Sequence, residues 1–444
     1  MMTKKIIGIF MAVIMIAAAA LLTACQSSTG AEELSTVTET VASTVQNTED
    51  NATEAESSTT AVTDTSADVI TTTANTTSNG KIDATDLFSD RDLRQTADLS
   101  EAVSYTVEDG KTITINTAGV YVISGSAQNA QIIVEAGDED KVQLVLSGVT
   151  ITNTSTPAIY VKNADKVFVT TASGTNNSLS VTGTFTADGT TNTDAVIFSK
   201  DDLILNGLGT LTISSSDNGI SGKDDIKITG GTITINSTSD AIEANESIAV
   251  ADGNITIKTD KDGLHAENDE DTTTGYIYIC GGTFKINADS DGIRATTVVQ
   301  IDGGTFDITS SEGIEGTYVQ INGGDISVSA SDDGLNATSK STAYTVTIEI
   351  NGGSITIDMG QGDTDAIDSN GNLYINGGEL NITAQSPFDY DGEGQYNGGT
   401  MIVNGSQTTE LTNQMMGGGM GGPGNMGGPG DMNNNGNMGG NFRF

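Results

Sequence analysis

The sequence predicts an all-β fold, a parallel β-helix in which a repeat of about 22 residues forms each coil. Three observations support this: a recurring motif of acid, small residue and Ile or Leu, paired apolar residues two positions apart, and repeated Gly-Gly turns. The motif begins at Asp217, Asp240, Asp262, Asp291, Glu312, Asp333 and Asp365. Because the motif repeats at nearly constant length, we expect equivalent residues to stack along one axis.

The apolar pairs, such as Ile226 with Ile228, have the two-residue period of a strand with one buried face. Turns such as Asn322-Gly323-Gly324 suit sharp corners, since Asn and Gly tolerate positive φ. A single coil cannot bury its apolar side, whereas stacked coils can. A propeller would need longer blades, and a sandwich would not repeat its sequence.

The first residues predict an export signal. Lys4-Lys5 precede an apolar run over 6–22, and Leu22-Thr23-Ala24-Cys25 fits a bacterial lipoprotein cleavage pattern. We expect a signal peptide over 1–24 and lipidation of Cys25, which would display the chain as a lipoprotein on the extracellular face of the cell membrane. An ordinary signal peptide and a membrane helix are the alternatives.

Composition divides the remaining chain into three parts. Residues 25–80 are rich in Ser and Thr and predict a disordered stalk. Residues 81–412 carry the strand pattern and predict the β-helix. Residues 413–444 are rich in Gly, Met and Asn and predict a disordered tail. With Cys25 assigned to the lipid, Cys280 is expected to be a free thiol.

The formal net charge of −41 excludes nucleic acid as a natural partner. Motif acids stacked about 4.8 Å apart would repel one another unless protons, hydrogen-bonded corners or cations compensate them. Hard oxygen ligands suit Ca²⁺. The predicted metal ligands are Asp240, Glu243, Asp260, Asp262, Asp289, Asp291, Glu312, Glu315, Asp333 and Asp365. The alternative is that these acids only cap corners through hydrogen bonds to the backbone.

The residue after each motif Ile or Leu should point outward, next to the acids. This outward line contains three candidates for carbohydrate contacts, His265, Arg294 and Asn336, and Tyr278 on another strand is a fourth. The small residue of each motif would leave a shallow strip open to an extended chain, or would simply relieve the corner.

Several strands between residues 95 and 410 resemble a family of bacterial cell-surface carbohydrate-binding β-helix proteins. The resemblance is carried by Gly119–Gly125, Lys141–Val149, Pro157–Val161, Ser199–Leu203 and Gly207–Leu211, followed by the Asp-Gly-Ile repeats. It implies a right-handed β-helix similar to pectate lyases, bound Ca²⁺, and binding to acidic polysaccharides of the pectin type and to cellulose.

The leading functional prediction is a monomeric, lipid-anchored protein that binds polysaccharide through Ca²⁺ without turning it over. The first alternative is a Ca²⁺-dependent lyase, in which Arg294 would be the base for β-elimination. The second alternative is a structural or adhesive spacer whose cations only hold the coils together.

Overall fold

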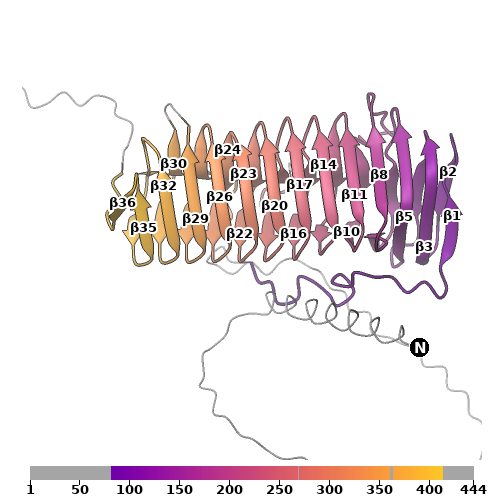
Figure 1. Ribbon diagram of the computed structural model, residues 1–444, viewed down its shortest axis with the longest axis horizontal. Coiled ribbons are helices and arrows are strands. Elements are labelled where there is room, and N and C mark those ends of the chain that lie inside the picture. Colours follow the sequence, from indigo (N-terminus) through magenta and orange to yellow (C-terminus); the bar gives the residue numbers. More distant parts are fainter. Residues whose placement is uncertain (1–81, 269, 361–363, 414–444) are drawn as a thin grey trace, which may run out of the picture.

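The computed structural model describes residues 82–268, 270–360 and 364–413. Within these ranges every regular element is a β-strand, and Figure 1 shows the strands stacked side by side along one rod. A search of the same ranges for an apolar helix able to cross a membrane finds none. The predicted signal peptide, Cys25, the stalk and nearly all of the tail lie outside the described residues.

The strands form three columns. The first column is a twelve-stranded sheet, and its strands are β2 (Thr112–Ile115), β4 (Gln131–Glu135), β6 (Ile159–Asn163), β9 (Ala195–Ser199), β12 (Asn218–Gly222), β15 (Ile242–Ala244), β18 (Leu264–Ala266), β21 (Asp291–Ala295), β24 (Glu312–Gly316), β27 (Asp333–Ala337), β30 (Asp365–Ser369) and β33 (Asp389–Tyr390). The second column contains β1 (Val103–Thr106), β7 (Lys166–Thr171), β10 (Asp202–Gly207), β13 (Ile226–Ile228), β16 (Ser247–Val250), β19 (Tyr276–Ile279), β22 (Val298–Ile301), β25 (Tyr318–Ile321), β28 (Thr347–Ile350), β31 (Asn372–Ile375) and β34 (Gly394–Tyr396).

The third column contains β8 (Asn176–Val181), β11 (Thr210–Ser215), β14 (Thr232–Ser237), β17 (Asn254–Thr259), β20 (Thr283–Ala288), β23 (Thr305–Ser310), β26 (Asp325–Ala330), β29 (Ser354–Met359), β32 (Glu379–Thr383) and β35 (Thr400–Val403). Two long strands, β3 (Gly119–Gln128) and β5 (Lys141–Asn153), join the second and third columns. The last strand, β36 (Ser406–Thr408), turns back antiparallel to β35, whereas the other pairings between these strands are parallel.

The core lies inside the rod, where equivalent apolar residues stack in register. Ile220 pairs with Ile242, and Ile242 pairs with Leu264, and all three side chains are fully buried. Phe284 and Phe306 stack with their ring centroids 4.7 Å apart. The all-β prediction is therefore confirmed, and the parallel columns are consistent with a solenoid; handedness and coil length stay predictions.

Residues 82–102 form no strand, although the sequence pattern was expected to begin near Ile82. They run as a strap along the second column (Figure 1). The strap is held by side chains that reach backbone oxygens: Lys227 Nζ donates to Leu87 O at 2.8 Å, and Gln95 Nε2 donates to Thr229 O at 2.7 Å. One further expectation is wrong, because Cys280 is disulfide-bonded and not a free thiol.

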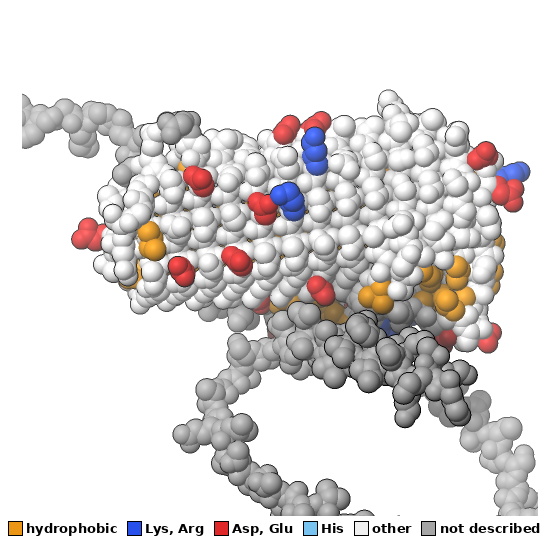
Figure 2. Space-filling view, in the orientation of Figure 1, with side chains coloured by type: hydrophobic (Ala, Val, Ile, Leu, Met, Phe, Trp, Pro, Cys, Tyr) orange, Lys and Arg blue, Asp and Glu red, His pale blue; other side chains and the backbone are white. Residues whose placement is uncertain are grey.

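The third column presents a face with little charge. Figure 2 shows scattered acidic and basic side chains on an otherwise uncharged surface. Its outward positions include Thr212, Thr234 and Thr256, which pair in register. Since this face carries few of the acids, the negative charge must be concentrated elsewhere.

Candidate functional site: an acidic strip along the first column

The first column carries the acids of the motif. In β15, β18, β21, β24 and β27 the motif Ile or Leu points into the core, so the preceding acid lies at the corner and the following residue faces outward. Register pairs join the outward residues in the order Ser221, Glu243, His265, Arg294, Glu315, Asn336, Asp368 and Asp389. We call the motif acids from Asp240 to Asp365, together with Glu243, Glu315 and Asp368, the acidic strip.

The side chain of a corner acid accepts a hydrogen bond from the backbone of the next coil. Asp240 Oδ1 accepts a hydrogen bond from the backbone N–H of Asp262 at 3.0 Å, and Asp262 Oδ1 accepts one from that of Asp291 at 3.0 Å. The glycine that follows is needed for the close approach of successive coils: a Cβ on Gly263 would lie 2.5 Å from the backbone oxygen of Gly292. The glycines therefore serve backbone packing, and each capping acid keeps a second oxygen for other contacts.

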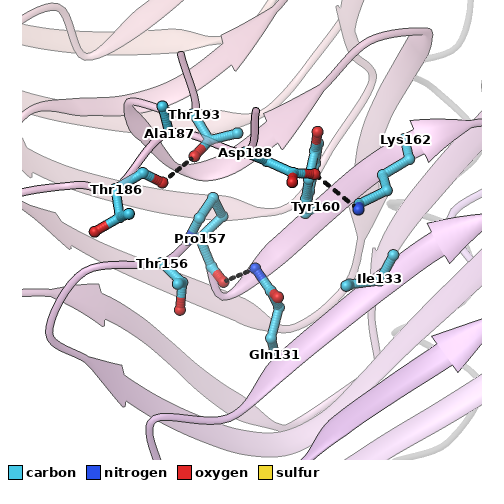
Figure 3. Close-up of a pocket in the computed structure, with 10 residues that line it drawn as sticks. All are labelled: Gln131, Ile133, Thr156, Pro157, Tyr160, Lys162, Thr186, Ala187, Asp188 and Thr193. Carbon is cyan, nitrogen blue, oxygen red and sulfur yellow. Dashed lines mark hydrogen bonds and ion pairs between the residues drawn. The ribbon is translucent and has the colours of Figure 1, made fainter. Parts of the chain in front are cut away.

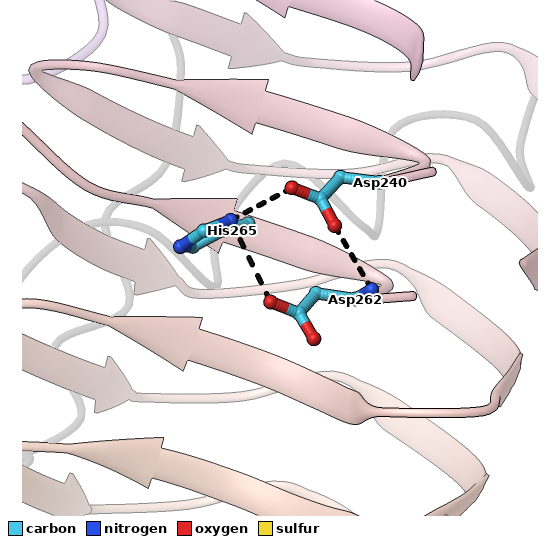
Figure 4. Close-up of side chains that lie close together, drawn as sticks. All are labelled: Asp240, Asp262 and His265. Carbon is cyan, nitrogen blue, oxygen red and sulfur yellow. Dashed lines mark hydrogen bonds and ion pairs between the residues drawn. The ribbon is translucent and has the colours of Figure 1, made fainter. Parts of the chain in front are cut away.

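His265 is surrounded by carboxylates (Figure 4). Its Nδ1 lies 2.8 Å from Asp240 Oδ2 and 3.5 Å from Asp262 Oδ2, and its Nε2 lies 2.8 Å from Glu267 Oε2. Burial alone would lower the pKa of His265, but the hydrogen bonds to Asp240 and Glu267 raise it to about 10. A protonated imidazole has no lone pair for a metal, so this triad is an ion-paired group.

Two more cations continue this network. Arg294 Nη1 lies 3.5 Å from Asp262 Oδ2, and Arg294 Nε lies 3.5 Å from Glu315 Oε2 and 3.8 Å from Asp291 Oδ2. Lys340 Nζ lies 2.9 Å from Glu315 Oε2. Burial would lower the pKa of Arg294, but the surrounding carboxylates, Asp262 foremost, raise it further. Arg294 is therefore held in its charged form.

These three cations do not neutralise the middle of the strip. The ligating atoms of Asp291, Glu312 and Glu315 all lie within 4.8 Å of one another. Burial, and then the charges of Asp262 and the two glutamates, raise the pKa of Asp291 above its usual range. Burial and the charge of Glu315 likewise raise the pKa of Glu312. The raised pKa values indicate that the negative charges of this cluster repel one another in spite of the three cations.

Asn336 closes one side of the cluster. Its side chain is 8% exposed, and its Nδ2 donates to Glu312 Oε2 at 2.8 Å. Its Oδ1 is buried without a hydrogen-bond partner among the described residues. Leaving a buried acceptor unpaired costs about 1–3 kcal/mol, so this oxygen is available to a water or a cation.

The strip continues toward the C-terminal end. Asp333 pairs in register with Asp365, and Asp333 Oδ1 accepts a hydrogen bond from the Asp365 N–H at 3.3 Å. Burial, and then the charge of Asp368, raise the pKa of Asp333 to about 7. Burial, and then the charge of Asp389, raise the pKa of Asp368 to about 6.

Some predicted site residues do not join the cluster. Asp260 and Asp289 are exposed. Glu243 accepts hydrogen bonds from Asn218 Nδ2 at 2.8 Å and Ser221 Oγ at 3.0 Å. Tyr278 lies on β19 in the second column, where it is 3% exposed, packs near Phe88 of the strap and donates to Asp302 Oδ2. Tyr278 is thus far from any exposed line that a polysaccharide could follow.

Sequence reasoning missed other groups. Glu267 follows His265 at the end of β18, and Lys340 comes from the insertion near 339–344, so neither belongs to the repeat. A separate group of close carboxylates, Asp202, Asp224 and Asp225, lies beside β10 and β13, outside the strip. The only signal for these residues was their charge, which an acidic chain offers at many positions.

The chain is similar to known proteins in sequence and in structure. A solved structure of the polysaccharide lyase-like protein from C. thermocellum, a gadolinium derivative, is 27% identical with a TM-score of 0.43, covering 66% of this chain and 100% of that one. A carbohydrate-binding domain-containing protein of Acetivibrio thermocellus is 35% identical over 156 residues, 34% of this chain and 53% of that protein, so the chain spans about half the length of this relative. A family profile matches residues 109–364 and 310–415, and the chain belongs to the family of carbohydrate-binding domain-containing proteins.

Proposed function

We propose that the chain is a surface protein that binds acidic polysaccharide through Ca²⁺ held by the acidic strip. The family supports a polysaccharide-binding role. The observation that carries the proposal is the cluster of Asp291, Glu312 and Glu315, with its close carboxylates and the unpartnered Oδ1 of Asn336 beside them.

The residues of the cluster fit a Ca²⁺ ion. All the donors are oxygens, and three of the four side chains are carboxylates that repel one another without a cation. Asn336 would supply a neutral oxygen that now lacks a partner. Asp240, Asp262 and His265 do not fit as well, because both ring nitrogens of His265 already contact carboxylates, Nδ1 that of Asp240 and Nε2 that of Glu267.

A bound Ca²⁺ would supply positive charge where the chain has too little. Ca²⁺ takes six to eight oxygen ligands, more than these four side chains are placed to give, so positions remain for water or for sugar carboxylates. A polyanionic protein and a uronate chain would otherwise repel each other. The binding partner we infer is therefore a polysaccharide rich in uronic acid, such as pectin, rather than cellulose.

The lyase alternative depends on Arg294. A general base must be neutral, whereas the carboxylates around Arg294 keep it charged. This observation favours binding over β-elimination. We also propose surface display by a lipid on Cys25, which intact-mass measurement of the mature protein tests.

The proposal is tested by retention on immobilised polygalacturonate with Ca²⁺ or with EDTA, while ultraviolet absorbance reports unsaturated product. We expect retention only with Ca²⁺, and no product. Product formation would establish a lyase. A chain that is not retained under either condition would be a spacer, and equal retention in both would exclude the Ca²⁺ bridge.

A matched pair of variants locates the site. Asp291→Asn changes a cluster residue, whereas Asp289→Asn removes the same charge two residues away at an exposed position outside the cluster. We expect only Asp291→Asn to weaken Ca²⁺-dependent retention. Equal loss in both variants would mean that overall charge, and not the cluster, controls binding.

A further inference from the structure

A cavity of about 210 Å³ lies on the same first column, at its N-terminal end (Figure 3). It is enclosed by β4, β6 and the 182–194 loop. The outward line of the acidic strip leads to it, because Ser221 pairs with Phe198, Phe198 with Tyr160, and Tyr160 with Ile133. Six rungs of about 4.8 Å place Tyr160 roughly 29 Å from Glu315 along this line.

One side of the cavity is apolar. It is formed by Ile133, Pro157 and Tyr160. The Tyr160 ring packs edge-on against Phe198 with the centroids 5.7 Å apart, which fixes the ring in place. Burial, and then the charge of Asp188, raise the pKa of Tyr160, so its hydroxyl stays protonated.

The polar lining lies beside these apolar residues and carries no net charge. Lys162 Nζ lies 2.8 Å from Asp188 Oδ2 and 5.1 Å from the centroid of the Tyr160 ring. Gln131 Nε2 donates to Pro157 O at 3.1 Å, which orients its amide at the cavity wall. Thr193 Oγ1 donates to Thr186 O at 3.0 Å and ties the loop over the cavity. The site thus offers fixed donors and acceptors without an unbalanced charge.

Tyr160 is only 3% exposed and has Lys162 over its ring, so the cavity offers a small apolar wall beside ordered hydrogen-bonding groups, which suits a compact ligand with a few apolar atoms and several hydroxyls. A single pyranose ring has this shape and chemistry. A uronate would bring a carboxylate that Lys162 cannot neutralise while it is paired with Asp188. Its volume of about 210 Å³ is smaller than the roughly 300–1,000 Å³ of typical ligand pockets, so its size suits a single ring.

We propose that the cavity lined by Tyr160, Lys162 and Asp188 is a subsite for one uncharged sugar ring. The inference rests on the proposed polysaccharide-binding function and narrows it: the polysaccharide carries neutral sugars as well as uronates, and the two kinds of unit bind at opposite ends of the same face. The subsite needs no Ca²⁺, whereas the acidic strip does.

The test is saturation-transfer NMR on the full chain in EDTA, with D-glucose, D-galactose, D-mannose and L-rhamnose as neutral probes and D-galacturonate as the acidic one. Ala187→Trp would fill the cavity mouth from an exposed lining position, and Thr184→Trp is its control at an exposed position of the same loop that does not line the cavity. We expect at least one neutral sugar to bind the natural chain and Thr184→Trp, and Ala187→Trp to weaken that binding at least roughly tenfold.

Lys162→Met leaves the cavity open and removes a hydrogen-bonding group, so it should also weaken neutral-sugar binding if Ala187→Trp fails to fold. The proposal is overturned if no neutral sugar binds, if Ala187→Trp and Lys162→Met bind as the natural chain does, or if galacturonate binds better than every neutral sugar. Lys285→Met, a change at an exposed position of the third column, should leave sugar binding in EDTA unchanged. Failure of the proposed function is seen separately, as loss of Ca²⁺-dependent retention with the sugar signal intact.

Discussion

Two ladders of stacked polar side chains run along the rod, one of asparagines and one of acids. In the asparagine ladder each amide donates to the next: Asn351 Nδ2 reaches Asn322 Oδ1, Asn376 Nδ2 reaches Asn351 Oδ1, and Asn397 Nδ2 reaches Asn376 Oδ1, each at 2.8 Å. In the acidic strip an ionised carboxylate cannot donate to its neighbour, so the acids use backbone N–H groups and the three cations.

The difference separates a structural ladder from a functional one. An amide has both a donor and an acceptor, so stacked asparagines satisfy one another and close their corners without outside help. Stacked carboxylates at about 4.8 Å repel, and burial increases the cost. If the acids served only to cap corners, asparagine would do so at lower cost. Their presence therefore supports a role that requires negative charge.

The largest expected effect comes from making the acidic strip resemble the asparagine ladder. Asp291→Asn combined with Glu312→Gln keeps the shapes and removes two charges. We expect Ca²⁺ affinity to fall on the order of 100-fold, because two ligands lose their charge. The melting temperature in EDTA should rise, since buried repulsion is relieved. Titration calorimetry and scanning calorimetry measure the two effects.

The opposite result would identify these acids as structural. If the double variant melts at a lower temperature in EDTA and binds Ca²⁺ as the natural chain does, then the carboxylates serve the corners and not a metal. Asp289→Asn with Asp260→Asn is the control, because it removes two exposed charges outside the cluster.

The second expected effect is on the pH dependence of stability. The pKa of Asp333 is raised from 3.8 to about 7. Between pH 3.8 and about pH 7 the folded state therefore binds more protons than the unfolded state, and the free energy of unfolding falls as pH rises. The pKa of His265 is raised from 6.5 to about 10, so this residue also lowers the free energy of unfolding as pH rises between those two values. The pKa of Glu267 is lowered from 4.5 to about 2 by its hydrogen bond to His265. The stability that Glu267 contributes is therefore lost as pH falls from 4.5 to about 2.

The metal-free protein should therefore be most stable near about pH 5 and lose stability toward pH 8. Ca²⁺ should flatten this decline, because it replaces the protons that the acids would otherwise keep. Melting temperatures over this pH range, with Ca²⁺ and with EDTA, check the expectation. Parallel curves under the two conditions would contradict it.

The repeat allowed the sequence to predict the strands and the corners. A one-residue slip would turn Ile242 or Leu264 out of the core, so the apolar pattern alone determines which side of each strand is buried. The strap over 82–102 could not be predicted, because it has no periodicity and is held by contacts such as that of Lys227 with Leu87, which are distant in the sequence.

The site was predicted only where it follows the repeat. Asp291, Glu312 and Glu315 occupy repeated positions, and the structure brings them together. Lys340 comes from an insertion, so its position beside Glu315 had no periodic signal. Tyr278 was assigned to carbohydrate because alternation predicts an outward side chain, but alternation does not show that the strap covers that face.

A third, smaller effect is expected at Lys340, which neutralises Glu315. Lys340→Met keeps the length of the side chain and removes the charge. We expect the metal-free protein to lose about 1 kcal/mol of stability, because Glu315 is buried and its partner is partly exposed. Ca²⁺ affinity should rise by roughly threefold to tenfold, since the ion no longer competes with an ammonium group.

Lys285→Met is the matched control for that variant. Lys285 and Asp307 form an ion pair of 2.7 Å, but their side chains are 70% and 60% exposed. Exposed pairs contribute about 0–1 kcal/mol, so neither stability nor Ca²⁺ binding should change much. If both lysine variants alter Ca²⁺ affinity equally, the effect is one of overall charge and not of contact with Glu315.

The smallest effect is expected from a substitution that places an acid in one rung of the asparagine ladder. Asn351→Asp removes the donor to Asn322 Oδ1 and adds a charge, and Asn351→Ala removes the hydrogen bonds alone. Because Asn351 is exposed, each change should cost at most about 1 kcal/mol, and chemical denaturation measures it. Neither change should make stability depend on Ca²⁺, because the carboxylate beside Asn351, that of Glu349, already accepts hydrogen bonds from Tyr318 and Gln320. A Ca²⁺-dependent gain in stability for Asn351→Asp would show that a single acid in a stack suffices, and the case for a built cluster at Asp291 would fail.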